Sequence, residues 1–318
     1  MVSPSETLVT VFGGGGFIGR YVCECLLKSG ARVRVAQRNP RQAYTIQPLA
    51  QVGQFGLERA DITKPASVAH ALRGANAAIN LCGVFGSNMR RVHVEGAGNI
   101  ARAASEAGCE ALVHVSAIGA DPDGRALYAR TKGDGEAEVR RSFAGATVVR
   151  PSLVFGPEDN LTNRFAGMAR LPVLPVLAAD SKFQPVYVRD LGQAIAMAAL
   201  DPLRFGGSTY EIGGPQVMTM VELNRAILGL TGQTPEVAVL PDIAGTLLSK
   251  FGWLPGAPLT ADQWTMLQQG SVPSGNLPGL EAFGIEPTPL AAVGYEWLGR
   301  FHKGGKFDRR RIHLTATG

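Results

Sequence analysis

The sequence predicts an α/β protein in which a doubly wound parallel sheet is followed by a smaller C-terminal α/β subdomain. Three observations lead to this fold class. Apolar, β-rich runs alternate with helical patterns over the first 157 residues, as a parallel α/β sheet requires. A glycine-rich turn, GGGGFIG at 13–19, joins the first run to the first helix. Beyond residue 157 the alternation loosens, so a second and less regular unit is expected there.

The first half of the chain supplies the elements of the sheet in order. The apolar run 8–12 is the first strand, and the helix that begins at Phe17 is expected to stop at Gly30. Further strands are expected at 31–38, 77–83, 111–118 and 146–155, and a short one is expected to end near 58–62, with helices at 64–74, 90–108 and 127–143. Because strand–helix–strand units cross over right-handed, these strands should form one parallel sheet.

The second half is less regular. A helix is expected at 161–171, a strand that enters a helix at 184–200, and a strand at 209–214. Capping boxes mark two further helix starts, at Thr219 with Glu222 and at Thr260 with Gln263. The predicted domains are the sheet domain 1–157 with a contribution from about 184–200, the smaller subdomain 158–302, and a basic tail 303–318.

Size and composition indicate a globular protein with a substantial core. The chain has 318 residues, of which 45% are hydrophobic, and it contains no low-complexity block. Its net charge of +5 is modest, and no nucleic-acid partner is expected. The four cysteines lack zinc spacing, so no metal site is expected and the thiols are interpreted as structural in a reducing compartment. No run of about 18 apolar residues occurs, and no membrane-spanning helix is predicted.

The glycine turn has the spacing of a dinucleotide site. Gly13, Gly16 and Gly19 form a GxxGxxG pattern between a strand and a helix. Such a turn needs a tight bend, a backbone that can approach pyrophosphate, and close packing of the helix on the strand. Free N–H groups at the helix start, where Phe17 and Ile18 lie, would then hold the phosphates. A Rossmann-type domain is therefore predicted for 1–157, the alternative being a glycine-rich turn without a ligand.

The residues after the second strand favour NADPH over NADH. The sequence Ala36-Gln37-Arg38-Asn39 offers no carboxylate for the adenosine ribose hydroxyls, whereas Arg38 could pair with a 2′-phosphate. Arg20 could assist, and the alternative is that both arginines are ordinary surface residues. The ends of the next two strands supply the remaining expected contacts, Asp61 and Ile62 beside the adenine, and Leu81, Cys82 and Gly83 beside the ribose and phosphates.

Tyr128 and Lys132 form a YxxxK pair on one face of a predicted helix. A lysine cation lowers the pKa of a nearby phenol, so that the phenol can exchange a proton with a carbinol during hydride transfer. The pair is therefore a candidate catalytic pair, with a role as cofactor ligands only as the alternative.

Together these motifs resemble the extended or atypical short-chain dehydrogenases/reductases. The resemblance rests on GGGGFIG, NLCG, HVSAIGA, YARTK and VVRPSLVFGPEDNLTNRF, and it covers nearly the whole chain. The second half, from RPSLVFGPEDNLTNRF to KFQPVYVRDLGQAIAMAAL and TYEIGGP, is similar to the nucleotide-binding accessory subunits of respiratory complex I. The resemblance implies a tightly bound NADPH and a position at the junction of the peripheral and membrane arms. No catalytic turnover is assigned to that family.

The resemblance also implies residue roles. It assigns the phosphate turn to Gly13, Gly16 and Gly19, the 2′-phosphate contact to Arg38, the ribose and nicotinamide contacts to Tyr128 and Lys132, and a backbone contact beside the nicotinamide to Pro151. One departure bears on activity, because Ala117 stands where active reductases carry a Ser or Thr that binds the substrate carbonyl. Ser116 lies one residue earlier and should face the opposite way along the strand. Ordinary dehydrogenase turnover is therefore not expected.

Two functions from different classes follow. The first is an NADPH-binding accessory subunit of complex I, peripheral on the cytoplasmic face of a bacterial inner membrane or on the matrix face of a mitochondrial one. The second is a free-standing NADPH-dependent reductase or epimerase on a small polar substrate, or a relative that acts in quinone biosynthesis. The basic tail 303–318 could contact acidic lipid headgroups, a partner protein or RNA, and we interpret it as a docking arm.

The segment 240–256 leaves two interpretations open. Ile243, Leu247, Phe251 and Leu254 fall on one helical face. That face could lie against lipid or a membrane subunit, or it could be part of the subdomain core.

Overall fold

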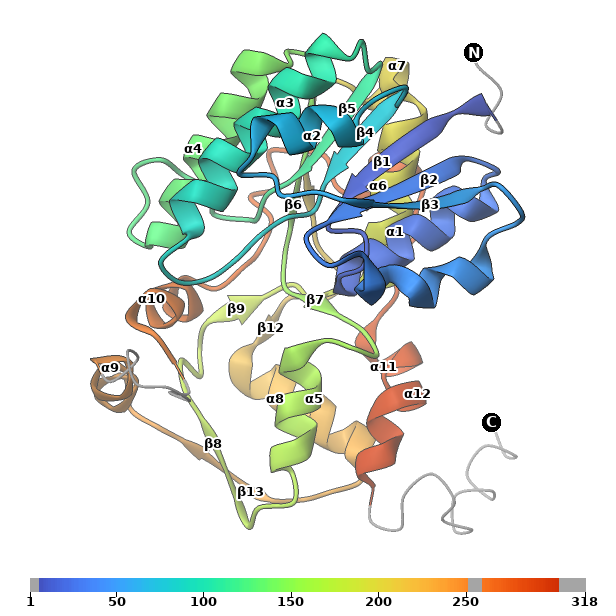
Figure 1. Ribbon diagram of the computed structural model, residues 1–318. Coiled ribbons are helices and arrows are strands. Elements are labelled where there is room, and N and C mark those ends of the chain that lie inside the picture. The colour runs from blue at the N-terminus through green and yellow to red at the C-terminus, as the bar shows by residue number, and fades with distance from the viewer. Residues whose placement is uncertain (1–5, 251–258, 303–318) are drawn as a thin grey trace. The chain divides into compact units, whose positions relative to one another are not determined.

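The computed structural model describes residues 6–250 and 259–302, and the chain divides into two compact units (Figure 1). The first unit consists of Met1–Ser152, Val188–Gly213 and Ser271–Pro287, and the second of Leu153–Tyr187, Gly214–Gly270 and Thr288–Gly318. This division differs from the predicted boundaries, because the chain leaves the first unit at residue 152 and returns to it twice. The predicted basic tail lies outside the described residues.

The first unit is built on a seven-stranded parallel sheet in the order β11-β6-β5-β4-β1-β2-β3. The strands are β1 (Leu8–Phe12), β2 (Arg32–Gln37), β3 (Phe55–Arg59), β4 (Ala77–Asn80), β5 (Ala111–Val115), β6 (Thr147–Pro151) and β11 (Thr209–Ile212). The predicted doubly wound parallel sheet is confirmed. Strand order reverses between β1 and β4, and in open α/β sheets ligands bind at the carboxyl ends of the strands beside such a reversal.

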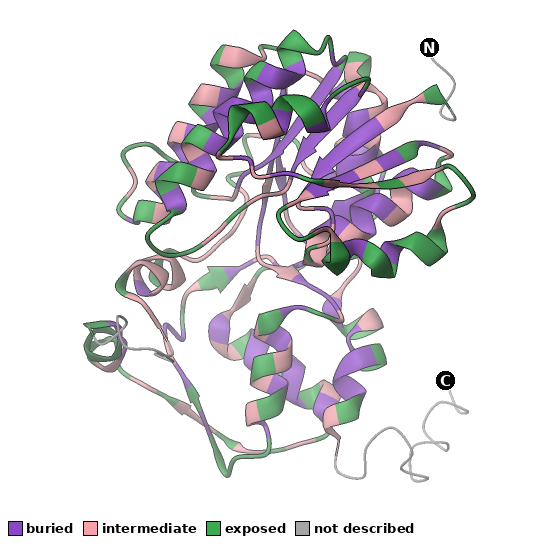
Figure 2. Cartoon of the chain, in the orientation of Figure 1, coloured by how far each residue is buried: buried purple, intermediate pink, exposed green. Residues whose placement is uncertain are grey.

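Helices cover both faces of this sheet. On one face α1 (Phe17–Lys28) packs against α6 (Val188–Leu200), and the other face carries α2 (Pro65–Ala71), α3 (Ala97–Glu106) and α4 (Leu127–Ser142). The core between the sheet and this second layer includes Phe12, Leu72, Ile100 and Leu112, all fully buried. Figure 2 shows the central strands buried along their length. Strands covered on both faces read as continuous apolar runs, which explains why the sequence located them.

The segment 271–287 returns to the first unit because it covers the edge strand β11. The backbone N–H of Glu211 donates to the carbonyl of Pro278 at 3.0 Å. The Glu211 carboxylate accepts the N–H of Ser274 at 2.5 Å. Phe283 stacks on Phe205 of the short helix α7 (Pro202–Phe205) with ring centroids 4.6 Å apart. An edge strand presents unpaired backbone groups, and the Pro278 carbonyl satisfies one of them, the N–H of Glu211.

The second unit carries short paired strands and several helices. The strand pairs are β7 (Val154–Phe155) with β10 (Val186–Tyr187), β8 (Val173–Val176) with β13 (Glu236–Val239), and β9 (Lys182–Phe183) with β12 (Met218–Thr219). The helices are α5 (Asn160–Met168), α8 (Met220–Thr231), α9 (Asp242–Lys250), α10 (Ala261–Gln269), α11 (Leu290–Val293) and α12 (Tyr295–Leu298). Both predicted capping boxes are present, at the starts of α8 and α10.

Two predicted elements are divided between the units. The strand expected at 146–155 is β6, which ends at Pro151, followed by β7 of the second unit. The strand and helix expected at 184–200 are β10 of the second unit and α6 of the first. An apolar run specifies a strand but not its partner, and therefore the crossings at 152 and 188 left no signal in the sequence.

Helix α9 presents its large aliphatic side chains outward. Ile243 is 76% exposed and Leu247 60% exposed, whereas Gly245 and Ser249 are buried. A Cβ added at Gly245 would collide with the indole of Trp264, so α9 packs on α10 through its small residues. Within the second unit, Ile243 and Leu247 therefore do not belong to the core. Phe251 and Leu254 lie outside the described residues.

Candidate functional site

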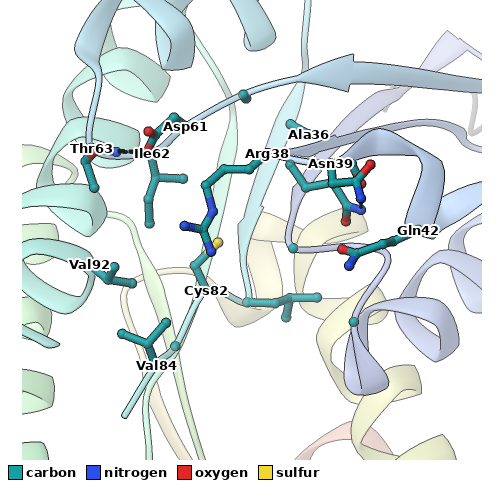
Figure 3. Close-up of a pocket in the computed structure, with 16 residues that line it drawn as sticks. Ala36, Arg38, Asn39, Gln42, Asp61, Ile62, Thr63, Cys82, Val84 and Val92 are labelled. Carbon is teal, nitrogen blue, oxygen red and sulfur yellow. Dashed lines mark hydrogen bonds between the residues drawn. The ribbon is translucent and has the colours of Figure 1, made fainter. Parts of the chain in front are cut away.

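A cavity of about 600 Å³ opens at the carboxyl ends of β1, β2 and β4 (Figure 3). Of the predicted nucleotide contacts, its wall contains Gly13, Gly16, Arg38, Asp61, Ile62, Leu81, Cys82 and Gly83. The sequence stretches that supply them are far apart, and the sheet brings them together at the reversal of strand order. The same wall contains Gln37, Asn39, Gln42 and Thr63, to which sequence reasoning assigned no contact.

The glycine turn is bent tightly between β1 and α1. Gly13 has φ +82°, a conformation that favours glycine, and its carbonyl accepts the N–H of Gly16 at 3.0 Å. Gly19 packs under the turn, because an added Cβ would lie 2.5 Å from the carbonyl oxygens of Gly13 and Gly14. At Gly16 the nearest atom to an added Cβ is 3.2 Å away. Gly19 thus serves helix packing, whereas Gly16 leaves open space beside the cavity.

The first turn of α1 is free to meet an anion. The N-cap residue is Gly16, so no side chain accepts a hydrogen bond from the first N–H groups of the helix. The first turn also contains no acidic residue. The first N–H groups of a helix, here including those of Phe17 and Ile18, have no acceptor within the helix. Together with the helix dipole they favour a negative charge at this position. Arg20 follows in the same helix and is not among the residues of the cavity wall.

Gln37 fastens the glycine turn to the end of β2. Its Oε1 accepts the N–H of Gly15 at 2.8 Å, and its Nε2 donates to the carbonyl of Asn39 at 2.6 Å. Gln37 thus places a neutral side chain at the strand end where sequence analysis sought a carboxylate. Its position at the end of the second strand was the only feature of the sequence that pointed to this role. The hydrogen bond to Gly15 could not be predicted, because Gly15 is 22 residues away.

Arg38 extends from the end of β2 into the cavity, toward Ile62 and Cys82 (Figure 3). Asp61 faces it from the loop after β3. Burial acts to raise the pKa of the Asp61 carboxyl, but hydrogen bonds from Thr63 Oγ1 (2.8 Å) and Thr63 N (3.0 Å) hold that pKa below its usual range. The cations of Lys64 and Arg38 act in the same direction. Asp61 therefore remains ionised.

Asn80 and Cys82 shape the wall after β4. Asn80 Oδ1 accepts the N–H of Cys82 at 3.0 Å, and Asn80 Nδ2 is 3.0 Å from Nδ1 of His114. Burial raises the pKa of the Cys82 thiol to about 11, so it is protonated and unreactive at neutral pH.

Lys132 lies directly behind this wall, whereas Tyr128 does not contribute to it. Lys132 Nζ donates to the carbonyl of Val115 at 3.0 Å, and an added Cβ at Gly83 would lie 3.5 Å from it. Burial lowers the pKa of Lys132 to about 8. Tyr128 stacks on Phe85 with ring centroids 4.6 Å apart, and Lys132 Nζ is 5.8 Å from the centre of the phenol ring.

His93 connects the cavity wall to α4, and sequence reasoning missed it. The N–H of Val84 donates to Nε2 at 3.0 Å, which places the ring proton on Nδ1, 2.9 Å from Thr131 Oγ1. His93 lies in a π-helical turn, Arg91–Gly96, where a regular helix was expected. Its carbonyl is so close to Gly135 that an added Cβ there would collide with it. The π-helical turn is wider than a regular helical turn, and within it both the ring and the carbonyl of His93 contact α4.

Burial, with a contribution from the Lys132 cation, lowers the pKa of His93 to about 3. The unfolded chain, with a histidine pKa near 6.5, binds more protons between these two values. The free energy of unfolding should therefore fall as the pH drops from 6.5 toward 3, by up to about 1.4 kcal/mol per pH unit from this group. We expect His93→Gln to flatten this slope in denaturant titrations. His70→Gln, on the surface of α2, is the matched control, and equal slopes in wild type and His93→Gln would contradict the assignment.

Ser116 and Pro151 lie outside the wall. Ser116 is 3% exposed, and its hydroxyl has no hydrogen-bond partner among the described residues. Pro151 ends β6, and its carbonyl accepts the N–H of Ile118 at 3.1 Å. Ala117, the position that follows Ser116, carries no hydroxyl.

The arrangement fits a phosphate-bearing ligand more readily than a metal. In residues 6–250 and 259–302, no group of histidine, cysteine and acidic side chains could hold a metal ion. The cavity instead combines an uncapped helix start, a close-packed glycine turn and a cationic side chain.

Residues 6–250 and 259–302 contain no helix that is long and apolar enough to cross a bilayer.

Comparisons with known proteins agree with this chemistry. Residues 13–165 match a family model described as NAD(P)H-binding. The mitochondrial subunit 9 of the NADH dehydrogenase (ubiquinone) 1 alpha subcomplex from Rattus norvegicus is 33% identical over 307 residues, which span 94% of this chain and 81% of that protein. The mitochondrial NADH-ubiquinone oxidoreductase 40 kDa subunit of Neurospora crassa is 28% identical over 308 residues, spanning 94% and 80%.

Among solved structures, an NADPH-dependent quinone oxidoreductase from Escherichia coli, in complex with NADPH, superposes with a TM-score of 0.72. It shares 20% sequence identity and covers 90% of this chain and 98% of its own. At this identity the likeness establishes the fold alone.

Proposed function

This chain belongs to the family of subunit 9 of the NADH dehydrogenase (ubiquinone) 1 alpha subcomplex, and on that premise we propose that it is an NADPH-binding accessory subunit of respiratory complex I. The observation that carries the proposal is the similarity to the rat subunit across 94% of this chain. The position of the cavity also supports nucleotide binding, because it lies where a Rossmann-type sheet binds its dinucleotide.

The cofactor is a nicotinamide dinucleotide, as the NAD(P)H-binding family model supports. The preference for NADPH over NADH is part of the proposal and rests on two side chains. Arg38 extends into the cavity, and Gln37 brings no negative charge to the end of β2. A carboxylate at that position would repel a 2′-phosphate, whereas a guanidinium binds phosphate through charge-assisted hydrogen bonds.

The proposed contacts follow the shape of the cavity. The pyrophosphate lies at the glycine turn and the N–H groups of Phe17 and Ile18, with Arg20 nearby. Asp61 and Ile62 border the adenine, and Leu81, Cys82 and Gly83 border the ribose and phosphates. Tyr128, Lys132 and Pro151 would approach the nicotinamide end. When bound, the dinucleotide brings the capacity for hydride transfer, but we assign it a structural role that stabilises the folded chain.

Two features favour a structural role over independent turnover. Ala117 has no hydroxyl at the position where active reductases carry a Ser or Thr, and the neighbouring Ser116 is buried. Phe85 stacks on one face of the ring of Tyr128, the residue predicted to exchange the proton. Tyr128 and Lys132 are then cofactor ligands, with Lys132 held in place by the Val115 carbonyl.

The proposed location is peripheral on the membrane, at the junction of the peripheral and membrane arms of complex I. Other complex I subunits would be the partners. The exposed Ile243 and Leu247 on α9 offer an apolar surface for such a contact or for lipid. On the bacterial inner membrane this is the cytoplasmic face, and in mitochondria it is the matrix face.

Affinity purification distinguishes the two functional classes. We expect the tagged chain, produced in its native host and extracted in mild detergent, to be recovered with complex I subunits and with NADH:quinone oxidoreductase activity. A tagged soluble reductase of similar size is the control for carry-over. Recovery instead as a soluble oligomer that reduces a carbonyl substrate with NADPH would support the free-standing reductase.

A further inference from the structure

A second, smaller recess adjoins the nucleotide cavity at the junction of β3 and α2. It has a volume of about 320 Å³ and is lined by Arg38, Arg59, Ala60, Asp61, Lys64 and Ser67. Arg38, Ala60 and Asp61 border both the recess and the larger cavity. The recess is therefore an extension of the site beyond Arg38, on the side of the edge strand β3.

The sheet places the recess beside the end of β2. Gln37 of β2 is the register partner of Arg59 of β3, and the N–H of Ala60 donates to the Gln37 carbonyl at 3.1 Å. The chain then turns through Asp61, whose carbonyl accepts the N–H of Lys64 at 2.9 Å. This turn brings the cations of Arg59 and Lys64 to a recess that already contains Arg38.

The recess carries an excess of positive charge. Among the ion pairs and side-chain hydrogen bonds of the described residues, none involves the side chain of Arg59 or Lys64, although the Lys64 cation acts on the nearby Asp61 carboxylate. The single acid, Asp61, already accepts two hydrogen bonds from Thr63. Ser67 Oγ accepts the N–H of Asp61 at 3.0 Å, and this leaves its hydroxyl hydrogen for an acceptor.

We propose that this recess binds the 2′-phosphate of NADPH, with Arg59 and Lys64 as residues that determine specificity together with Arg38. The inference rests on the proposed nicotinamide cofactor. It increases the number of cations assigned to the 2′-phosphate from one, Arg38 at the end of β2, to three. A phosphate monoester carries close to two negative charges at neutral pH, so one guanidinium compensates only part of it. NADH has no group to place there and should not respond to the charge of the recess.

The test compares ligands with and without that phosphate. We would measure dissociation constants of NADPH, NADH, 2′,5′-ADP, 5′-AMP and inorganic phosphate for wild type, Arg59→Gln, Lys64→Gln and the double variant. Each substitution should weaken NADPH and 2′,5′-ADP by about fivefold, as an exposed charged contact of roughly 1 kcal/mol implies, and leave NADH and 5′-AMP unchanged. Arg73→Gln, an exposed cation that follows α2 at the other end of the sheet, is the control.

Salt gives an independent readout. The affinity for NADPH should decrease with ionic strength more steeply in wild type than in the double variant, because exposed charges are screened. Inorganic phosphate is the probe for a general anion site. If it competes with NADPH while 2′,5′-ADP binds no tighter than 5′-AMP, the recess does not recognise the 2′-phosphate of the nucleotide, and the proposal is overturned.

Two further outcomes would overturn it in distinguishable ways. If wild type prefers NADPH and both variants keep that preference, the recess plays no part while the cofactor assignment stands. If wild type binds NADPH and NADH equally, the cofactor preference itself fails. Neither result depends on whether the chain is recovered with complex I subunits.

Discussion

Replacement of Gly16 by valine is expected to abolish nucleotide binding while the chain still folds. Gly16 is the N-cap of α1, and the only atom close to an added Cβ is the Gly13 carbonyl oxygen at 3.2 Å. The rest of the side chain would extend into the cavity, where the pyrophosphate must approach the backbone. We expect affinity for NADPH to fall by at least about 100-fold, the equivalent of about 2.7 kcal/mol.

The measurement is a thermal or denaturant unfolding series with and without nucleotide. In wild type, ligand at 100 times its dissociation constant should add about 2.7 kcal/mol to the free energy of unfolding, and in Gly16→Val almost nothing. Gly56→Val is the matched control, because an added Cβ at that strand position meets no atom within 4 Å. Undiminished stabilisation of Gly16→Val by NADPH would place the dinucleotide elsewhere.

Replacement of Arg38 by aspartate is expected to reverse the preference for NADPH. The substitution removes the cation that enters the cavity and places a second carboxylate near Asp61. Charge-assisted bonds to phosphate contribute roughly 1.5–3 kcal/mol, so the dissociation constant of NADPH should rise about tenfold to a hundredfold. NADH lacks the 2′-phosphate and serves as the internal control.

Direct binding titrations with both nucleotides, together with chromatography of nucleotide released from denatured protein, would measure this change. Arg38→Gln separates loss of the cation from gain of the carboxylate, and it should weaken NADPH less than Arg38→Asp does. Equal amounts of NADH and NADPH released from wild type would contradict the assigned role of Arg38.

Local patterns were sufficient to predict the sheet, because its central strands β4 and β5 are buried throughout and its first turn has a fixed chemistry. The run ending at Phe12, the GxxGxxG turn and the helix after it occur where they were expected. The capping boxes at Thr219 and Thr260 were likewise readable, since both partners lie within one helical turn. These features depend on neighbours in the sequence.

Features that depend on distant residues could not be predicted. Gln37 bonds to Gly15, and His93 bonds to Thr131, which is 38 residues away. The return of 271–287 depends on the edge strand β11, and no periodicity in the segment signals it. In α9 the apolar spacing was readable but its direction was not, because the helix packs through Gly245 against Trp264. A periodic pattern states which residues share a face, not whether that face points inward.

The double hydrogen bond of Gln37 constrains how this site could evolve or be engineered. An acidic residue at 37 is the simplest route toward NADH, yet glutamate would set a carboxylate oxygen against the Asn39 carbonyl, where Nε2 now donates at 2.6 Å. Aspartate is one methylene shorter, and it would withdraw the acceptor from the Gly15 N–H as well. A switch of coenzyme through an acidic residue at position 37 would therefore require compensating substitutions in the glycine turn or at Asn39. The same residue that keeps the turn in shape makes the coenzyme preference resistant to any single substitution at position 37.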